Sequence, residues 1–140
     1  MRANRITLVT LGVADLDRSR AFYEALGWEV EKAMEETVFF DIGGARFGLY
    51  RREMLARDLD REPGDLGVGA MTLAQNFPTE AEVDAAYERA LGAGATVCRR
   101  PETVFWGGYS GTYADPDGHV WEVAMNPFWT LDAEGRLTDG

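Results

Sequence analysis

The sequence predicts an α+β fold built from two tandem modules, each with the order strand, helix, strand, strand, strand. Three observations predict it: this order of elements occurs twice, short sequence matches recur in both halves, and 140 residues is the length of one ordinary domain. We expect a single domain that comprises module one at 5–52, a connection at 53–69, module two at 70–127 and a C-terminal tail at 128–140.

Module one is marked by periodicity and by residues that start and end elements. Asp15 can cap a helix whose apolar residues recur at helical spacing, and Gly27 is typical of the position just past a helix end. The residues on either side of Gly43-Gly44 resemble two strands of a hairpin. The expected elements are a strand at 5–13, a helix at 16–26, and strands at 28–32, 37–42 and 45–50.

Module two repeats this pattern. Thr79 and Glu82 have the spacing of a capping box, and an apolar stripe at helical spacing follows over 83–91. Pro101 is expected to end the next strand, because proline has no N–H to donate to a strand ladder. The expected elements are a strand at 70–77, the helix, and strands at 95–99, 108–114 and 119–125, the last two joined by the turn Asp115-Pro-Asp-Gly.

Two short stretches of module one recur in module two in the same order. Val9-Thr-Leu matches Met71-Thr-Leu, and the stretch from Tyr23 to Gly27 matches the one from Tyr87, with one insertion. Either match alone is short enough to arise by chance. Their common order and near-equal separation favour an internal duplication.

Two longer stretches resemble a known group of proteins. The segment from Val9 to Trp28 is similar to the first module of the vicinal oxygen chelate superfamily, which includes glyoxalase I, bleomycin-resistance proteins and extradiol dioxygenases. The segment from Phe105 to Pro127, with its Asp-Pro-Asp-Gly-His turn and Val-Trp-Glu-Val strand, resembles the last hairpin of that group. The resemblance covers residues 5–127. It implies a mixed sheet of two βαβββ modules curled around a cavity, and it implies a homodimer.

The resemblance also implies where a metal would bind. Enzymes of the superfamily use a divalent ion as a Lewis acid, held by His, Glu or Gln from the first and last strands of each module. In this chain Leu8 and either Ala70 or Met71 stand at the first-strand positions. The last strand of module one, 47–50, offers no such side chain, and Glu122 alone matches a ligand position. One carboxylate is a poor site for Zn²⁺ or Ni²⁺, so we expect no bound metal.

Alternation along the last strand determines which side chains face the expected cavity. Trp121 and Val123 point one way and Glu122 the other, so Glu122 is expected to line the cavity as a ligand anchor or general base. The alternative for Glu122 is an ion pair with an arginine across the sheet, since a buried carboxylate is costly unless paired. Phe47 is interpreted either as a core residue or as a wall residue. The residues expected to contact a ligand are Thr10, Thr72 and Glu122 at the bottom, with Phe47, Trp106 and Tyr109 at the walls.

These features favour a small-molecule-binding protein that holds an apolar or aromatic ligand without a metal. The alternative is a metal-dependent lyase, isomerase or dioxygenase whose Zn, Ni, Fe or Mn ion is held by Glu122, by Gln75 or Glu53, and by a second subunit. A third hypothesis is acid/base catalysis by Glu122 without a metal. The residues alone leave open whether the chain is an enzyme.

The charge of the chain disfavours two classes of partner. Twenty-four Asp and Glu against fourteen Lys and Arg give a formal net charge of −10, which opposes binding to nucleic acid and to anionic membranes. No apolar run approaches the roughly 20 residues that cross a bilayer. Residues 1–10 do not have the pattern of a secretion signal, so we expect a cytoplasmic protein. A single histidine, His119, excludes a site with several His ligands from one chain.

Overall fold

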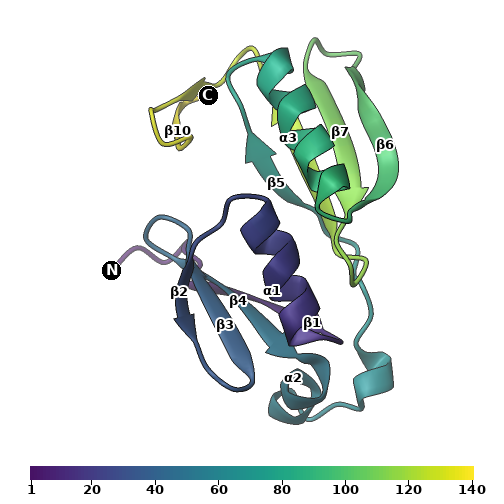
Figure 1. The fold of residues 1–140 in the computed structure, drawn as a ribbon. Coiled ribbons are helices and arrows are strands. Elements are labelled where there is room, and N and C mark those ends of the chain that lie inside the picture. Colours follow the sequence, from purple (N-terminus) through teal and green to yellow (C-terminus); the bar gives the residue numbers. More distant parts are fainter. The chain divides into compact units, whose positions relative to one another are not determined.

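The computed structural model describes all 140 residues, which form two compact units, Met1–Gly67 (unit 1) and Val68–Gly140 (unit 2). Each unit contains a four-stranded mixed sheet with one long helix packed on one of its faces (Figure 1). Neither sheet is closed, because each keeps two edge strands. The boundary between the units falls inside the segment that the sequence predicts as a connection.

Unit 1 has the predicted βαβββ order. In its sheet β1 runs parallel to β4, and the remaining neighbours are antiparallel, which gives the strand order β1-β4-β3-β2. The short helix α2 follows β4 directly and begins the predicted connection. The elements are β1 (Leu8–Val13), α1 (Leu16–Ala25), β2 (Val30–Ala33), β3 (Thr37–Asp41), β4 (Arg46–Arg51), α2 (Arg52–Asp58) and a 3₁₀ turn at Pro63–Asp65.

The ends of α1 are those that the sequence predicts. The Asp15 side chain accepts a hydrogen bond from the backbone N–H of Arg18 at 3.0 Å, which satisfies one of the free donors of the first turn. Gly27 has a φ of 97°, a left-handed conformation that glycine adopts without steric cost. The N–H of Trp28 then bonds the carbonyl of Tyr23 at 3.1 Å, which closes the helix end.

An aromatic cluster forms the core of unit 1 between α1 and the sheet. The ring centroids of Tyr23 and Phe47 are 5.4 Å apart, and those of Trp28 and Phe47 are 5.1 Å apart. Phe40 joins the cluster at 5.5 Å from Trp28. Tyr23 is 0% exposed and Phe47 is 2% exposed. Phe47 is therefore a core residue on the helix side of the sheet, and its alternative interpretation as a wall residue does not fit this placement.

Unit 2 has the same order and topology. Strand β5 runs parallel to β8, and the strand order is β5-β8-β7-β6. The tail that follows residue 127 contains a small antiparallel hairpin. The elements are β5 (Leu73–Asn76), α3 (Glu80–Gly92), β6 (Thr96–Thr103), β7 (Tyr109–Ala114), β8 (Val120–Met125), β9 (Thr130–Leu131) and β10 (Leu137–Asp139).

The core of unit 2 lies beneath α3. Thr79 caps this helix by accepting a hydrogen bond from the N–H of Glu82 at 3.2 Å, as the sequence predicts. Tyr87 and Tyr113 are buried with an edge-to-face contact at 6.1 Å. The Tyr87 hydroxyl donates to the carbonyl of Thr112 at 2.9 Å, so the one polar atom of this side chain is satisfied inside the core.

The prediction that Pro101 ends a strand is wrong. Strand β6 continues through Pro101 to Thr103, and its pairing with β7 shifts register between Arg99 and Glu102. A proline is tolerated there because β6 is an edge strand, where one side of the backbone has no ladder partner. The Pro101 ring packs over Gly111, where a Cβ would lie 2.8 Å from the proline nitrogen, so only glycine fits.

The two units repeat each other, with a different alignment from the one that the sequence matches suggest. Tyr23 and Tyr87 each follow the N-cap of their helix by eight residues, and both are fully buried. Across the sheets Thr10 stands beside Gly48, and Ala74 stands beside Glu122. Thr10 therefore corresponds to Ala74 and not to Thr72, which precedes Ala74 by two residues. The matched tripeptides of the first strands are out of register by two residues.

We expect Phe47→Ala to destabilise the protein by about 3–5 kcal/mol, because it removes a ring from the closed core of unit 1. Phe39→Ala, on the other side of the same sheet, is the matched control and should cost less than half as much. Chemical denaturation followed by circular dichroism measures both values. Equal losses would contradict the assignment of the two faces.

Candidate functional site

The sheet of unit 2 has one face under α3 and a second face that no helix of the unit covers, here named the open face of unit 2. Strand β8 shows the division most clearly. Trp121 and Val123 are 5% and 1% exposed on the helix side, and Glu122 projects from the open face between them. Strand pairing extends this assignment. The open face of unit 2 carries Ala74, Asn76, Arg99, Ser110, Thr112, Glu122 and Ala124.

Glu122 occupies the middle of this face and is partly buried. Its neighbours on the adjoining strands are Thr112 on β7 and Ala74 on β5. The carboxylate of Glu122 makes no hydrogen bond or ion pair with a residue of unit 2. The arginine of this face, Arg99, bonds Ser110 instead. The alternative in which Glu122 is neutralised by an arginine of the same sheet is therefore not the arrangement in unit 2.

Tyr109 lies on the opposite side of the sheet from Glu122. Tyr109 projects from the same face of β7 as Tyr113, which is in the core. Its hydroxyl donates a hydrogen bond to Asp84 Oδ1 on α3 at 2.6 Å. This bond to a carboxylate raises the pKa of Tyr109 to about 12. The structure thus directs Tyr109 toward the helix and leaves it outside the surface around Glu122.

Trp106 lies in the turn that joins β6 and β7. Its indole covers the backbone of Gly108 so closely that a Cβ there would overlap the ring. The side chain is 44% exposed, and the neighbouring Phe105 is fully exposed. The turn lies beyond one end of β7, whereas Glu122 pairs with Thr112 in the middle of that strand.

The two threonines expected at the bottom of the site lie one in each unit. Thr72 precedes β5 by one residue, is exposed, and stands two residues before Ala74 of the open face. Thr10 lies on β1 beside Gly48. Each threonine is therefore on or next to the side of its sheet that faces away from the long helix.

The open face of unit 1, the side of its sheet away from α1, is apolar at its centre and carries the ion pair of Arg46 and Asp41 at one end. The ring of Phe39 lies over Gly48, at 3.1 Å from where a Cβ would stand, and Leu8 flanks the same glycine. Leu8 is 45% exposed. At the other end of the face α2 covers Gly12 through Leu55. The result is a flat apolar surface beside the hydroxyl of Thr10.

The side chains at the superfamily's ligand positions do not fit a transition metal. When β1 is aligned with β5 by structure, Thr72, and not Ala70, stands at the position that corresponds to Leu8. The same alignment makes Gly48 the counterpart of Glu122. Leu8 and Gly48 offer no donor atom, and a neutral hydroxyl is not among the usual zinc ligands. The structure contains no group of three or more His, Cys, Asp or Glu side chains placed to hold a metal ion.

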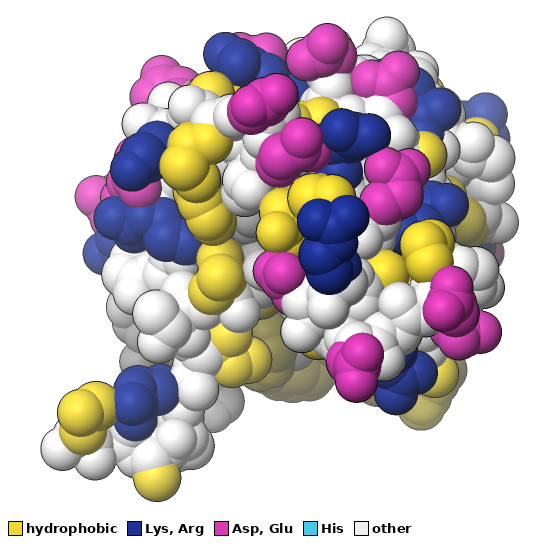
Figure 2. All heavy atoms as spheres, turned by 90° about the horizontal axis from the view of Figure 1, so that it is seen from below, with side chains coloured by type: hydrophobic (Ala, Val, Ile, Leu, Met, Phe, Trp, Pro, Cys, Tyr) yellow, Lys and Arg dark blue, Asp and Glu magenta, His cyan; other side chains and the backbone are white.

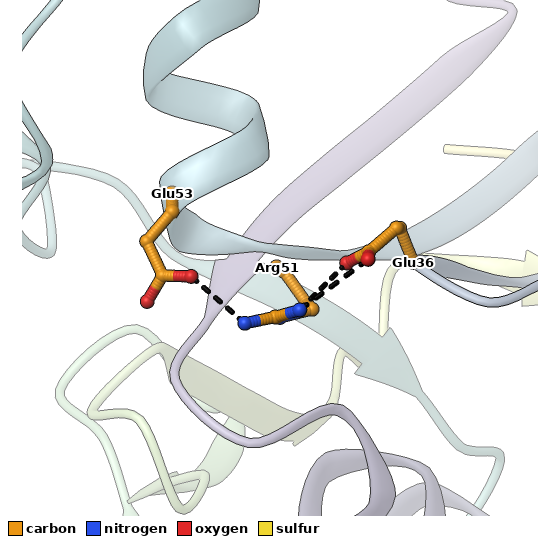
Figure 3. A network of polar contacts seen from close by, with 3 residues as sticks. All are labelled: Glu36, Arg51 and Glu53. Atoms are coloured by element: carbon orange, nitrogen blue, oxygen red, sulfur yellow. Dashed lines mark hydrogen bonds and ion pairs between the residues drawn. The ribbon is translucent and has the colours of Figure 1, made fainter.

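The two residues considered as substitute ligands are engaged elsewhere. Glu53 accepts from Arg51 Nη2 at 2.9 Å, and the same arginine bonds Glu36 through Nη1 at 3.0 Å (Figure 3). This network ties α2 to the end of β4 and to the turn before β3, and Glu36 raises the pKa of Arg51. Gln75 pairs beside Val123, on the helix side of unit 2. Gln75 therefore points away from Glu122, and Glu53 is engaged within unit 1.

The only histidine is part of the predicted turn before β8. The buried carboxylate of Asp115 accepts hydrogen bonds from the backbone N–H groups of Asp117 and His119, each at 2.9 Å. The turn closes with the N–H of Asp115 bonding the carbonyl of His119. Asp115 therefore holds the turn that leads into β8 and fixes where Glu122 emerges.

Acidic and basic side chains are interspersed on the surface seen in Figure 2, with apolar side chains between them. That face shows no continuous basic patch of the kind that phosphate backbones require. None of the helices is both long enough and apolar enough to span a membrane.

Sequence reasoning missed Arg99, Ser110 and Thr112 as members of the face around Glu122. The pairing of the last two strands could have identified Thr112, because both strands and the turn between them are predicted correctly. Arg99 gave no such signal. It reaches this face only because β6 contains a register shift between Val97 and Arg99.

Comparison with known proteins supports the resemblance that the sequence suggests. The model of the Glyoxalase/Bleomycin resistance protein/Dioxygenase superfamily matches residues 5–123. A glyoxalase-related enzyme from Fulvimarina pelagi is 34% identical, with a TM-score of 0.89 over 96% of this chain and 97% of that one. A lactoylglutathione lyase from Agrobacterium tumefaciens is 26% identical, with a TM-score of 0.71 over 94% of this chain and 100% of that one.

Uncharacterised proteins of Mycobacterium bovis and Mycobacterium tuberculosis match a shorter stretch. They are 49% identical over 47 residues, which is 34% of this chain. The matched stretch spans 31% and 28% of the length of these relatives. The structural likenesses extend over nearly the whole chain and confirm the predicted α+β fold of paired βαβββ modules.

We expect Asp84→Asn to lower the pKa of Tyr109 from about 12 toward the ordinary value of 10.0, because the carboxylate that favours the protonated phenol is removed. Ultraviolet titration of tyrosinate measures the shift, and Tyr109→Phe identifies the band among the five tyrosines. Because the folded-state pKa is raised, the Tyr109–Asp84 bond stabilises the protein below pH 10, and this contribution is lost as the pH rises through about 12. An unchanged pKa of Tyr109 in this variant would mean that its hydroxyl does not bond Asp84 of α3.

Proposed function

The chain belongs to the Glyoxalase/Bleomycin resistance protein/Dioxygenase superfamily, and from this membership we propose that it binds a small molecule against the open face of unit 2. The proposed ligand has an apolar or aromatic body and a cationic or hydrogen-bond-donating group. In this proposal the ligand is held without a resident metal. A homodimer and a cytoplasmic location belong to the same proposal.

Glu122 is the observation that carries this proposal. It is the one residue at a superfamily ligand position that has a donor suited to strong polar recognition, and its carboxylate has no partner within unit 2. A partly buried carboxylate without a counter-ion favours a ligand that supplies the missing positive charge or N–H group. The small side chain of Ala74 beside it leaves room for such a group.

The open face of unit 1 is a separate surface of its own unit that suits an apolar or aromatic group. Phe39 lying over Gly48 forms a flat aromatic surface, and the exposed Leu8 extends it. Burial of such surface stabilises a complex by roughly 25 cal/mol per Å² of apolar area removed from water. The hydroxyl of Thr10 gives this face one polar contact.

A metal-dependent lyase, isomerase or dioxygenase is the alternative function. It is favoured by the similarity to the Fulvimarina pelagi protein, described as a glyoxalase-related enzyme, and to the lactoylglutathione lyase. The donor set opposes it, since Leu8, Gly48 and Thr72 replace three ligands and Glu53 is ion-paired with Arg51. Acid/base catalysis by Glu122 needs no metal, and turnover that is insensitive to chelators would support it.

We expect Glu122→Gln to weaken binding of an aromatic cation by about tenfold, the effect of losing one charge-assisted hydrogen bond. Benzylamine is the probe, with benzyl alcohol as its neutral counterpart, and the shifts of backbone amide signals on titration measure both. The neutral probe, whose O–H can donate to a carboxylate or to an amide oxygen, should lose much less affinity than benzylamine.

Glu88→Gln is the matched control for this substitution. It removes the same charge from unit 2 at an exposed residue of α3 that pairs with Arg100 on the helix side. Benzylamine should bind this variant as it binds the parent protein. Equal weakening by both substitutions would mean that the loss of affinity comes from the change in net charge. No weakening by Glu122→Gln would mean that Glu122 does not contact the probe.

We expect protein purified without added metal and without chelator to contain no stoichiometric transition metal, because one carboxylate cannot replace three or more ligands. Elemental analysis by mass spectrometry measures the content, and added Zn²⁺, Ni²⁺, Fe²⁺ or Mn²⁺ should not raise the melting temperature. One equivalent of a tightly held metal that is lost in Glu122→Gln would overturn the metal-free proposal and favour the enzyme.

A further inference from the structure

A row of three side chains crosses the open face of unit 2. Arg99 on β6, Thr112 on β7 and Glu122 on β8 are direct neighbours across the strands, in that order. Two inter-strand spacings separate the first residue from the last, a backbone distance of about 10 Å. The two charged side chains do not pair with each other. In backbone register the face thus carries a positive and a negative residue on either side of Thr112, and the guanidinium itself lies beside Ser110.

The guanidinium of Arg99 is held in place by Ser110. Nη1 donates to the carbonyl oxygen of Ser110 at 2.7 Å, and Nη2 donates to its Oγ at 2.8 Å. Ser110 is 6% exposed, so this anchor is shielded from water. A guanidinium carries five N–H donors, and these two bonds leave others for an acceptor on the open side.

Glu102 partly neutralises Arg99. Its carboxylate lies 3.4 Å from Nη1, and its side chain is 62% exposed. An exposed ion pair of this length contributes little and is easily displaced. A ligand carboxylate that approaches Arg99 therefore competes with a weak partner.

Arg99 also has a structural role. It lies between two register shifts of β6, and its bonds to Ser110 hold the irregular strand against β7. A purely structural role of Arg99 does not explain why the carboxylate of Glu122 in the same row has no partner. It also does not explain why an edge of the guanidinium is exposed. The side chain of Arg99 is 37% exposed.

We propose that the open face of unit 2 selects a two-ended ligand, a small zwitterion whose cationic group binds Glu122 and whose carboxylate binds Arg99, with the Thr112 hydroxyl between them. This inference rests on the proposed small-molecule function and defines its ligand class. Each charge of the ligand meets the side chain of opposite sign, so neither end is desolvated without a partner. Molecules with a single charge fill one end of the row only.

The test compares three aromatic probes that differ only in their charged groups. They are para-aminomethylbenzoate, benzylamine and benzoate, titrated into the full chain and followed by backbone amide shifts. The zwitterion should bind about tenfold more tightly than benzylamine, the gain expected from one added charge-assisted hydrogen bond. Arg99→Met should remove this gain, so that para-aminomethylbenzoate binds the variant no more tightly than benzylamine does.

Glu102→Gln separates recognition from a purely structural role of Arg99. Removing the competing carboxylate should strengthen binding of para-aminomethylbenzoate and benzoate about two- to fivefold, by up to about 1 kcal/mol as expected for an exposed pair. Benzylamine should be unaffected. A structural clamp would show no such gain, and this variant keeps the test valid where Arg99→Met fails to fold.

The outcomes distinguish this inference from the proposed function beneath it. Binding of benzylamine that depends on Glu122, together with no advantage for the zwitterion, overturns the two-ended ligand and leaves the small-molecule function standing. Binding of all three probes that is indifferent to Glu122 overturns both. A zwitterion advantage that survives Arg99→Met overturns the assignment of Arg99.

Discussion

Each four-stranded sheet of this protein is held by one helix that packs on one of its two faces, and the rest of the structure depends on this one-sided packing. Tyr23 and Tyr87 occupy equivalent places on α1 and α3 and are fully buried. Every large side chain buried this way contributes roughly 1.5–3 kcal/mol. Because side chains alternate along a strand, the same packing leaves half of the strand residues on the open faces. Stability comes from the helix side, and the residues of the open faces contribute less to it.

How far the site could be predicted from the sequence depends on how clearly each strand displays its alternation. Around Glu122 the flanking Trp121 and Val123 leave a single assignment, and the structure agrees with it. Tyr109 could have been assigned from the sequence as well, because it is four residues before Tyr113 and shares its parity. Phe47 had two interpretations because Ala45 and Leu49, which share its alternation, are apolar, and Gly48 between them marks neither face.

Arg99 shows where sequence reasoning stops. Val97 pairs with Tyr113, so an unbroken ladder would set Arg99 opposite Gly111, on the helix side. The register shift that follows Val97 turns it to the open face, beside Thr112. No residue pattern specifies such a bulge in advance, since it results from fitting an edge strand with Pro101 against its neighbour. The βαβββ order of both units could be predicted, because capping residues and alternation are local.

The two units are alike on the helix side of their sheets and differ on the open side. Leu8 and Gly48 of unit 1 correspond to Thr72 and Glu122 of unit 2, so an apolar surface corresponds to a polar one. This difference follows from the packing, because a change on the open face costs little folding free energy, whereas a change beneath the helix leaves a cavity or a clash. A metal centre requires three or more donor side chains, and of these four residues only Glu122 offers a carboxylate. Recognition of an organic ligand requires only that each face offers some complementary surface, and a fold stabilised from one side can change that surface freely.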